Sequence, residues 1–309
     1  MLDALIAQEW PRDRFEIIVA DNGSTDATAA AVAAAAGRED APAVHYLFVA
    51  EPGKSYAVNR ALLVARGSIL AFTDDDVLPS RRWLAALAEG FGQRGVDFVA
   101  GRILPIWEAP PPPWMSPALF GVLAVPDNGD RRLDIGPGND GLVPLGANMA
   151  VRREVVDRIG GLRIDLGKLD GSLRTGEDHE FFLRMLRAGY RGAYDPNAVV
   201  RHLVSRERLQ PAYFRRWHYQ NGRDVAQLER PYRSSARRLF GIPRYLWRQA
   251  MTDVWSIVRA TLHGNESRRF AAEVRLIWLR GFVRESWFGA RRGSDPPAPA
   301  PIGRVSTAS

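Results

Sequence analysis

The chain contains no cysteine, so disulfide bonds and thiolate metal sites are excluded. It has no continuous apolar run near the ~18 residues that a membrane-spanning helix requires. Residues Met1 to Trp10 also lack the basic start and the cleavage site of a signal peptide. From these absences we expect a cytoplasmic protein, with a peripheral position on the inner face of the plasma membrane as one option.

Charge divides the chain into two parts. Residues 1–200 contain 21 Lys and Arg against 27 Asp and Glu, whereas residues 201–309 contain 21 Arg, no Lys and only 8 acids. We predict a domain over 1–205, a basic and Trp-rich helical extension over 206–292, and a disordered tail rich in Pro, Ala, Gly and Ser over 293–309. The basic third would suit an anionic surface, either phospholipid head groups or nucleic acid.

The acidic end of one predicted strand is the main candidate for chemistry. Residues 69–72 predict a strand buried on both faces, and Asp74, Asp75 and Asp76 follow it closely. On extended chain Asp74 and Asp76 point the same way, and their like charges favour a cation between them. An all-oxygen site of this kind suits Mg²⁺ or Mn²⁺ and leaves positions for substrate phosphates. Alternatively, one acid merely caps the next helix.

Two earlier turns follow predicted strands at 15–20 and 44–49. Asp21 ends the first strand, where open α/β sheets bind ligands, and it could accept hydrogen bonds from a base or ribose. A local turn that leads into the next helix is the simpler explanation. Lys54 stands near the start of another helix, where it either reaches a phosphate or remains a solvated surface lysine.

Glu177 and Asp178 open a predicted helix that ends near Gly189. The helix dipole favours carboxylates there, so we expect both acids to be ionised near neutral pH. Capping explains one acid, and a second could take a proton from an attacking hydroxyl. His202 lies in the last predicted strand, over 192–204, and is either a packing residue or a metal ligand.

Two further segments carry aromatic residues with open roles. Residues 103–142 are rich in Pro and Gly, and Trp107 and Trp114 there either stack on a sugar ring or anchor the segment. In the basic third, Phe270, Val274, Trp278 and Phe282 recur every fourth residue and predict an amphipathic helix. Such a helix either lies on a membrane surface or packs its stripe on the preceding domain, and both can hold for different helices.

Five motifs in order resemble the family 2 glycosyltransferases with the GT-A fold, over about Leu2 to Val204. They are Asp-Asn-Gly-Ser-Thr-Asp at 21–26, Gly-Lys-Ser at 53–55 with Asn59 and Arg60, the Asp-rich turn at 74–76, Gly-Ala-Asn-Met-Ala at 146–150 and Gly-Glu-Asp-His-Glu-Phe at 176–181. The resemblance implies an α/β fold with a mixed, mostly parallel sheet flanked by helices, followed by a helical extension. It also implies inverting transfer of a sugar from a nucleotide-diphosphate donor to a hydroxyl acceptor, in bacterial surface polysaccharide or glycolipid synthesis.

The resemblance assigns roles to single residues. Asp178 would be the catalytic base, and Asp74 and Asp76, completed by His202, would hold Mg²⁺ or Mn²⁺. The implied donor contacts are Asp21, Asn22, Lys54, Asn59, Asp75, Asn148 and Glu177. The implied acceptor is a glycan or lipid-linked glycan, with peripheral membrane contact through the basic C-terminal helices and no nucleic acid.

One feature departs from the family pattern, because no strand ending near Pro-Thr-Tyr-Asn precedes the helix at Leu2. We therefore expect either a start upstream of Met1 or a sheet that lacks an inner strand and has two unpaired edges. The alternatives to an active transferase are a truncated, inactive scaffold and a sugar-1-phosphate nucleotidyltransferase. The latter would normally carry a Gly-rich, basic phosphate loop after its first strand.

Overall fold

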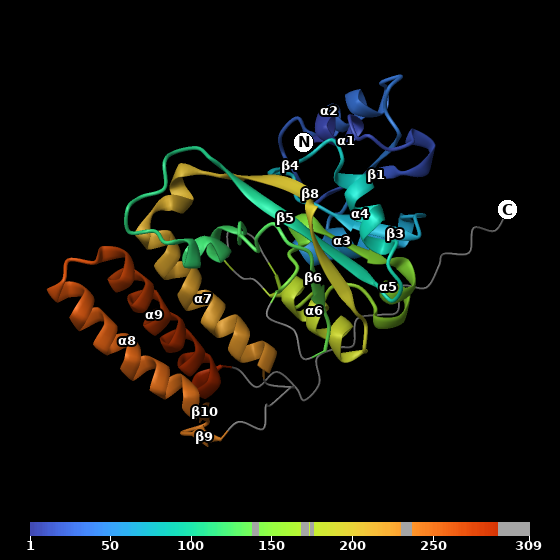
Figure 1. Ribbon diagram of the computed structural model, residues 1–309. Helices are drawn as coiled ribbons and strands as arrows, with labels where there is room; N and C mark the ends of the chain where they lie inside the picture. Colours follow the sequence, from blue (N-terminus) through green and yellow to red (C-terminus); the bar gives the residue numbers. More distant parts are fainter. Residues whose placement is uncertain (138–141, 168–172, 174–175, 230–236, 290–309) are drawn as a thin grey trace.

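The computed structural model describes residues 1–137, 142–167, 173, 176–229 and 237–289 (Figure 1). The predicted tail, 293–309, lies outside these residues. The strands are β1 Glu16–Asp21, β2 Ala43–Phe48, β3 Ile69–Phe72, β4 Val77–Pro79, β5 Phe98–Trp107, β6 Leu133–Ile135, β7 Met149–Arg152, β8 Gly192–Val204, β9 Arg238–Leu239 and β10 Ile242–Pro243. The α-helices are α1 Leu2–Ile6, α2 Thr28–Ala36, α3 Lys54–Val64, α4 Trp83–Phe91, α5 Arg153–Ile159, α6 Glu177–Arg187, α7 Pro211–Glu229, α8 Arg244–Leu262 and α9 Glu266–Phe288.

The main sheet has the order β3-β7-β5-β8-β4, with β6 also paired to β8. Among the strands described for this sheet only β5 and β8 pair in parallel, and β1 and β2 form a separate parallel pair. The prediction of a mixed sheet is confirmed, but the expectation of mostly parallel pairing is wrong. The physical reason is that β7 runs opposite to its neighbours β3 and β5, and that β4 and β6 run opposite to β8, so that four of the five described pairs of this sheet are antiparallel.

Among the described strands, β1 and β3 each have one edge without a strand partner. β1 bonds only to β2, and β3 bonds only to β7. The prediction that 69–72 is buried on both faces is wrong, because Leu70 is buried while Ala71 on the opposite face is exposed.

The core lies on both faces of the main sheet because alternate residues of β5 point to opposite sides. Phe98 belongs to a cluster with Phe181 and Phe182 of α6, and the rings of Phe98 and Phe182 meet edge to face at 5.8 Å. Val99 belongs to the cluster on the other side, together with Trp83 of α4. Helices α4 and α6 therefore cover opposite faces and fix the sheet between them (Figure 1).

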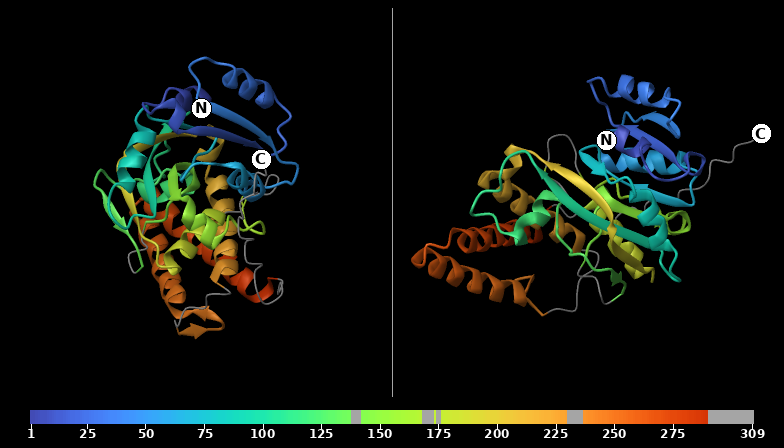
Figure 2. Two further views of the ribbon diagram at one scale, coloured as in Figure 1. Left: turned by 90° about the vertical axis from the view of Figure 1, so that its right-hand side faces the viewer. Right: turned by 45° about the horizontal axis from the view of Figure 1, so that its top comes forward.

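The helical extension packs as α7, then α9, then α8, moving away from the sheet (Figures 1 and 2). The α9 stripe is directed inward, with Phe270, Val274 and Phe282 buried, so the packing alternative holds for this helix. Trp114 meets Phe214 of α7 and Phe270 edge to face, which makes it an anchor for the Pro-rich segment. None of the helices that the structure describes is long and apolar enough to span a bilayer.

Candidate active site

Side chains from three predicted motifs meet at the N-terminal end of α3. The Nζ atom of Lys54 lies 2.9 Å from Oδ1 of Asp74, in the turn between β3 and β4. The same Nζ atom lies 3.9 Å from Oδ2 of Asp178, in the first turn of α6. It also interacts electrostatically with Glu177, the residue before Asp178. The structure thus gathers residues that are more than 100 positions apart in the chain.

The charges in this cluster shift the protonation of its members. Burial alone would lower the pKa of Lys54, but the carboxylates of Asp178, Asp74 and Glu177 outweigh burial and raise it above its ordinary value. Burial raises the pKa of Glu177 to about 7, the charge of Asp178 adds to this rise, and Lys54 opposes it. The expectation that Glu177 is fully ionised near neutral pH is therefore wrong, because burial outweighs the helix dipole.

Asp178 is held by a glycine that its own motif does not contain. The backbone N–H of Gly146 donates to Oδ2 of Asp178 at 3.0 Å. A Cβ atom at position 146 would lie 2.8 Å from both carboxylate oxygens, so no other residue fits without displacing Asp178. The only sequence signal for this contact is the glycine that opens the Gly-Ala-Asn-Met-Ala motif.

Asn148 lies in the core below this contact and is only 1% exposed. Its Nδ2 donates to the carbonyl oxygens of Arg102 at 2.9 Å and Ala198 at 2.8 Å. Its Oδ1 accepts from Nε1 of Trp83 at 2.8 Å. These bonds tie β5, β8 and α4 together, and they leave almost no surface of Asn148 for the predicted donor contact.

Two other motif asparagines hold the chain on either side of Lys54. Oδ1 of Asn22 accepts from the N–H of Gly53 at 2.6 Å, and its Nδ2 donates to the carbonyl of Val49 at 3.0 Å. Asn59 exchanges two hydrogen bonds of 2.7 Å with the backbone of Leu162. Both side chains position backbone, so a donor contact by either one would have to come in addition to these bonds.

Asp21 ends β1 and is buried at 5% exposure. One of its oxygens accepts from the N–H of Ser24 at 2.7 Å and the other from the hydroxyl of Tyr46 at 2.7 Å. The bond from Tyr46, followed by those from Ser24, lowers the pKa of Asp21. The local turn is confirmed, whereas the part played by Tyr46 was missed because no sequence pattern links β2 to this acid.

Asp76 and His202 form a second pair at the edge of the site. Oδ1 of Asp76 lies 3.3 Å from Nε2 of His202, and the pairing of β4 with β8 holds the two residues next to each other. His202 is buried, whereas Asp75 and Asp76 are both exposed in the turn before β4. Within the described residues no group of three or more potential ligands is assembled. A carboxylate and an imidazole nevertheless fit Mn²⁺ as two protein ligands, because such an ion takes its other ligands from water and phosphate.

Several proteins of known name are similar to this chain in sequence. The chain is 33% identical to the pre-mycofactocin glycosyltransferase of Mycobacterium tuberculosis over 151 residues, which are 48% of this chain and 30% of that protein. It is 29% identical to the succinoglycan biosynthesis protein ExoM of Rhizobium meliloti over 232 residues, 74% of this chain and 69% of that protein. The chain thus spans less than a third of the mycobacterial relatives it matches.

Solved structures agree with this fold. The mannosyltransferase PcManGT of Pyrobaculum calidifontis, in complex with GDP-Man and Mn²⁺, matches 93% of this chain and 82% of its own with a TM-score of 0.62 and 22% identity. TarS of S. aureus in complex with UDP matches 93% of this chain and 88% of its own with a TM-score of 0.53 and 16% identity. Such low identity shows the GT-A fold alone. The family described as Glycosyl transferase family 2 matches residues 1–160, just over half of the sequence, and the chain belongs to this family.

Proposed function

We propose that this protein transfers a sugar from a nucleotide-diphosphate donor to a hydroxyl acceptor with inversion at the anomeric carbon. The observation that carries the proposal is the position of Asp178. Its carboxylate is fixed by the Gly146 N–H, is partly exposed at 21%, and lies beside the Lys54–Asp74 pair. A fixed and accessible carboxylate next to a cation suits a base that works beside a phosphate group.

In the proposed step, the Asp178 carboxylate accepts the proton of the acceptor hydroxyl while the oxygen of that hydroxyl attacks the anomeric carbon. A new C–O bond forms on one face of the sugar, and the bond to the nucleoside diphosphate breaks on the opposite face with its electron pair. A single displacement of this kind inverts the configuration. A positioned base typically supplies a factor of ~10²–10⁴ in rate.

Lys54 would bind the diphosphate directly, and the acidic turn would bind it through a divalent cation. Asp76 and His202 fit a divalent cation, which when bound would neutralise charge on the leaving diphosphate. Asp74 is proposed as a further ligand, and its Oδ1 atom lies 2.9 Å from Nζ of Lys54. A cation bound to Asp74 would compete with the Lys54 ammonium for this carboxylate and would leave the ammonium to pair with a phosphate oxygen. Asp75 is exposed beside them and would face the donor sugar or ribose.

The names of the relatives and solved structures guide the choice of ligands. GDP-Man, with Mn²⁺, accompanies one structural neighbour and UDP another, so nucleotide-diphosphate donors are the first class to test. ExoM is named for succinoglycan biosynthesis. We propose a glycan or lipid-linked glycan acceptor in bacterial polysaccharide or glycolipid synthesis, with no part for nucleic acid.

Two linked measurements on the full chain test the proposal. A panel of UDP-, GDP- and dTDP-sugars with Mn²⁺ is screened by thermal shift, and the stabilising donor is then followed for release of nucleoside diphosphate. Asp178→Asn should lower the release about 10²-fold or more while leaving the thermal shift nearly unchanged, because the base acts in the chemical step. The exposed acid Asp13 supplies the control Asp13→Asn, which should match wild type. Full turnover by Asp178→Asn would refute the assigned base. Release of pyrophosphate from a nucleoside triphosphate supplied together with a sugar-1-phosphate would indicate a nucleotidyltransferase instead.

A further inference from the structure

One face of α8 is apolar and turned away from the protein. Its exposed stripe, here called the α8 stripe, has the helical spacing i, i+3, i+4, i+7 and i+11, and each side chain is between 53% and 78% exposed. The members are Met251, Val254, Trp255, Val258 and Leu262. The opposite side of the helix, marked by Leu246, Asp253 and Ala260, is buried against its neighbours. Figures 1 and 2 show α8 as the outermost helix of the extension.

The polar residues beside the α8 stripe are basic. Arg244, Arg248 and Arg259 of α8 are exposed, whereas the one acid of the helix, Asp253, is buried and bonded to Arg275 of α9. Arg268, near the start of α9, is exposed as well. The surface therefore combines apolar side chains with positive charge, and α8 contributes no exposed carboxylate to it.

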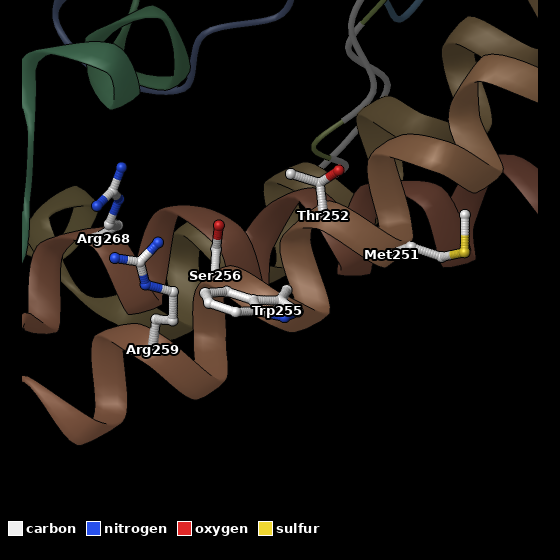
Figure 3. Close-up of a pocket in the computed structure, with 6 residues that line it drawn as sticks. All are labelled: Met251, Thr252, Trp255, Ser256, Arg259 and Arg268. Atoms are coloured by element: carbon white, nitrogen blue, oxygen red, sulfur yellow. The ribbon is translucent and has the colours of Figure 1, made fainter.

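A hollow of about 420 Å³ lies along the edge of the stripe, between α8 and α9 (Figure 3). Its lining includes Trp255, Ser256, Arg259 and Arg268. The guanidinium groups of Arg259 and Arg268 lie on the same side of it, and the Ser256 hydroxyl is turned the same way. The Arg259 guanidinium lies 4.8 Å from the centre of the Trp255 ring. Two guanidinium groups and a hydroxyl beside a half-exposed indole suit a phosphate that is attached to an apolar group.

We propose that α8 lies flat on an anionic lipid bilayer, with the α8 stripe in the acyl boundary and a lipid phosphate between Arg259 and Arg268. Apolar side chains, an interfacial tryptophan and flanking arginines are the features of helices that bind such surfaces. A second copy of the chain fits less well, because a two-fold contact would bring two copies of the same basic face together. The proposal concerns binding only and does not depend on the transferase assignment.

Vesicle flotation with the full chain tests the proposal. Wild type should float with phosphatidylcholine vesicles that contain about a third phosphatidylglycerol, and much less with phosphatidylcholine alone. Val258→Asp places a charge in the middle of the stripe and should abolish flotation. Arg259→Gln with Arg268→Gln should weaken partitioning about 30-fold, since each basic residue near an anionic surface contributes about a factor of 5. Raising the salt concentration should reproduce part of that loss.

A matched control removes two other exposed arginines, Arg94 and Arg158, which lie in the α/β domain. Arg94→Gln with Arg158→Gln should float like wild type, and circular dichroism should show that every variant is folded. Equal flotation of the two double variants would refute the phosphate site at Arg259 and Arg268, because the loss of binding would then depend only on the net charge of the protein. Flotation that changes neither with the lipid charge nor with Val258→Asp would refute the α8 stripe as the membrane-binding surface. A wild-type dimer that Val258→Asp dissociates, without lipid binding, would assign the stripe to a second copy and refute the proposal.

Discussion

Glu177→Gln should stabilise the protein at neutral and alkaline pH. Glu177 is 6% exposed, stands next to Asp178 and has a pKa raised to about 7, first by burial and then by the neighbouring charge. Ionising it inside the folded protein therefore costs free energy that the unfolded chain does not bear. Glutamine keeps nearly the same size and polarity without the charge, so the cost disappears.

The size and pH range of the effect follow from the two pKa values. The folded value of about 7 and the ordinary value of 4.5, at about 1.36 kcal/mol per pH unit, correspond to roughly 3 kcal/mol at most. Below about pH 4.5 both states hold the proton, so the residue adds no pH dependence. As the pH rises from 4.5 to 7, the unfolded chain releases its proton first and the folded state loses stability. Above about pH 7 the loss is complete.

Urea unfolding of wild type and Glu177→Gln between pH 4 and pH 8.5 measures this directly. The difference in unfolding free energy should be small near pH 4, grow through the interval, and level off above pH 7. Glu154→Gln is the matched control, because Glu154 is also an acid in the first turn of a short helix but is exposed. A difference that stays flat with pH, or that favours wild type at pH 8, would refute the account of a buried Glu177 whose pKa is raised.

Three further substitutions test the surrounding geometry. Lys54→Met should move the pH interval of the Glu177 effect upward, because the Lys54 ammonium lowers the pKa of Glu177. The same urea titration measures this shift, and an unchanged interval would contradict the interaction between Lys54 and Glu177. Asn148→Ala should cost about 2–4 kcal/mol in urea unfolding, since it leaves buried carbonyls and an indole N–H without partners. Gly222→Ala should lower the free energy of unfolding by about 1–3 kcal/mol, because its Cβ would strike the backbone of Trp278 where α7 crosses α9. An unchanged midpoint of urea unfolding in Gly222→Ala would mean that α7 and α9 can move apart enough to accommodate the methyl group.

Much of the fold was predictable because hydrophobic spacing reports local structure. The strand at 192–204 and the helix ending near Gly189 are confirmed as β8 and α6. Pair direction was not predictable, since nothing local in Met149–Arg152 states that β7 enters between β3 and β5. The same limit explains β3, whose apolar residues indicate burial but not its place at the end of the sheet.

The candidate site shows a similar division between chemistry and geometry. Residue type and motif order pointed to Asp74 and Asp178, and the structure brings both to Lys54. Partners that act through distant backbone or a neighbouring strand were not predictable, as with Gly146 for Asp178 and Tyr46 for Asp21. Burial also raises the pKa of Glu177 to about 7, and this depends on packing that a single sequence does not display.

Helix α3 is the element through which the separate motifs act on one another. Asn22 bonds to the turn before its first residue, Lys54 reaches Asp74 and Asp178 from that residue, and Asn59 holds the loop at Leu162 from the next turn. Because a helix is stiff over two turns, these contacts fix the Lys54 ammonium relative to both carboxylates. The motif asparagines therefore support the proposed activity by positioning: they set where the charge lies, and Asp74, Lys54 and Asp178 supply it.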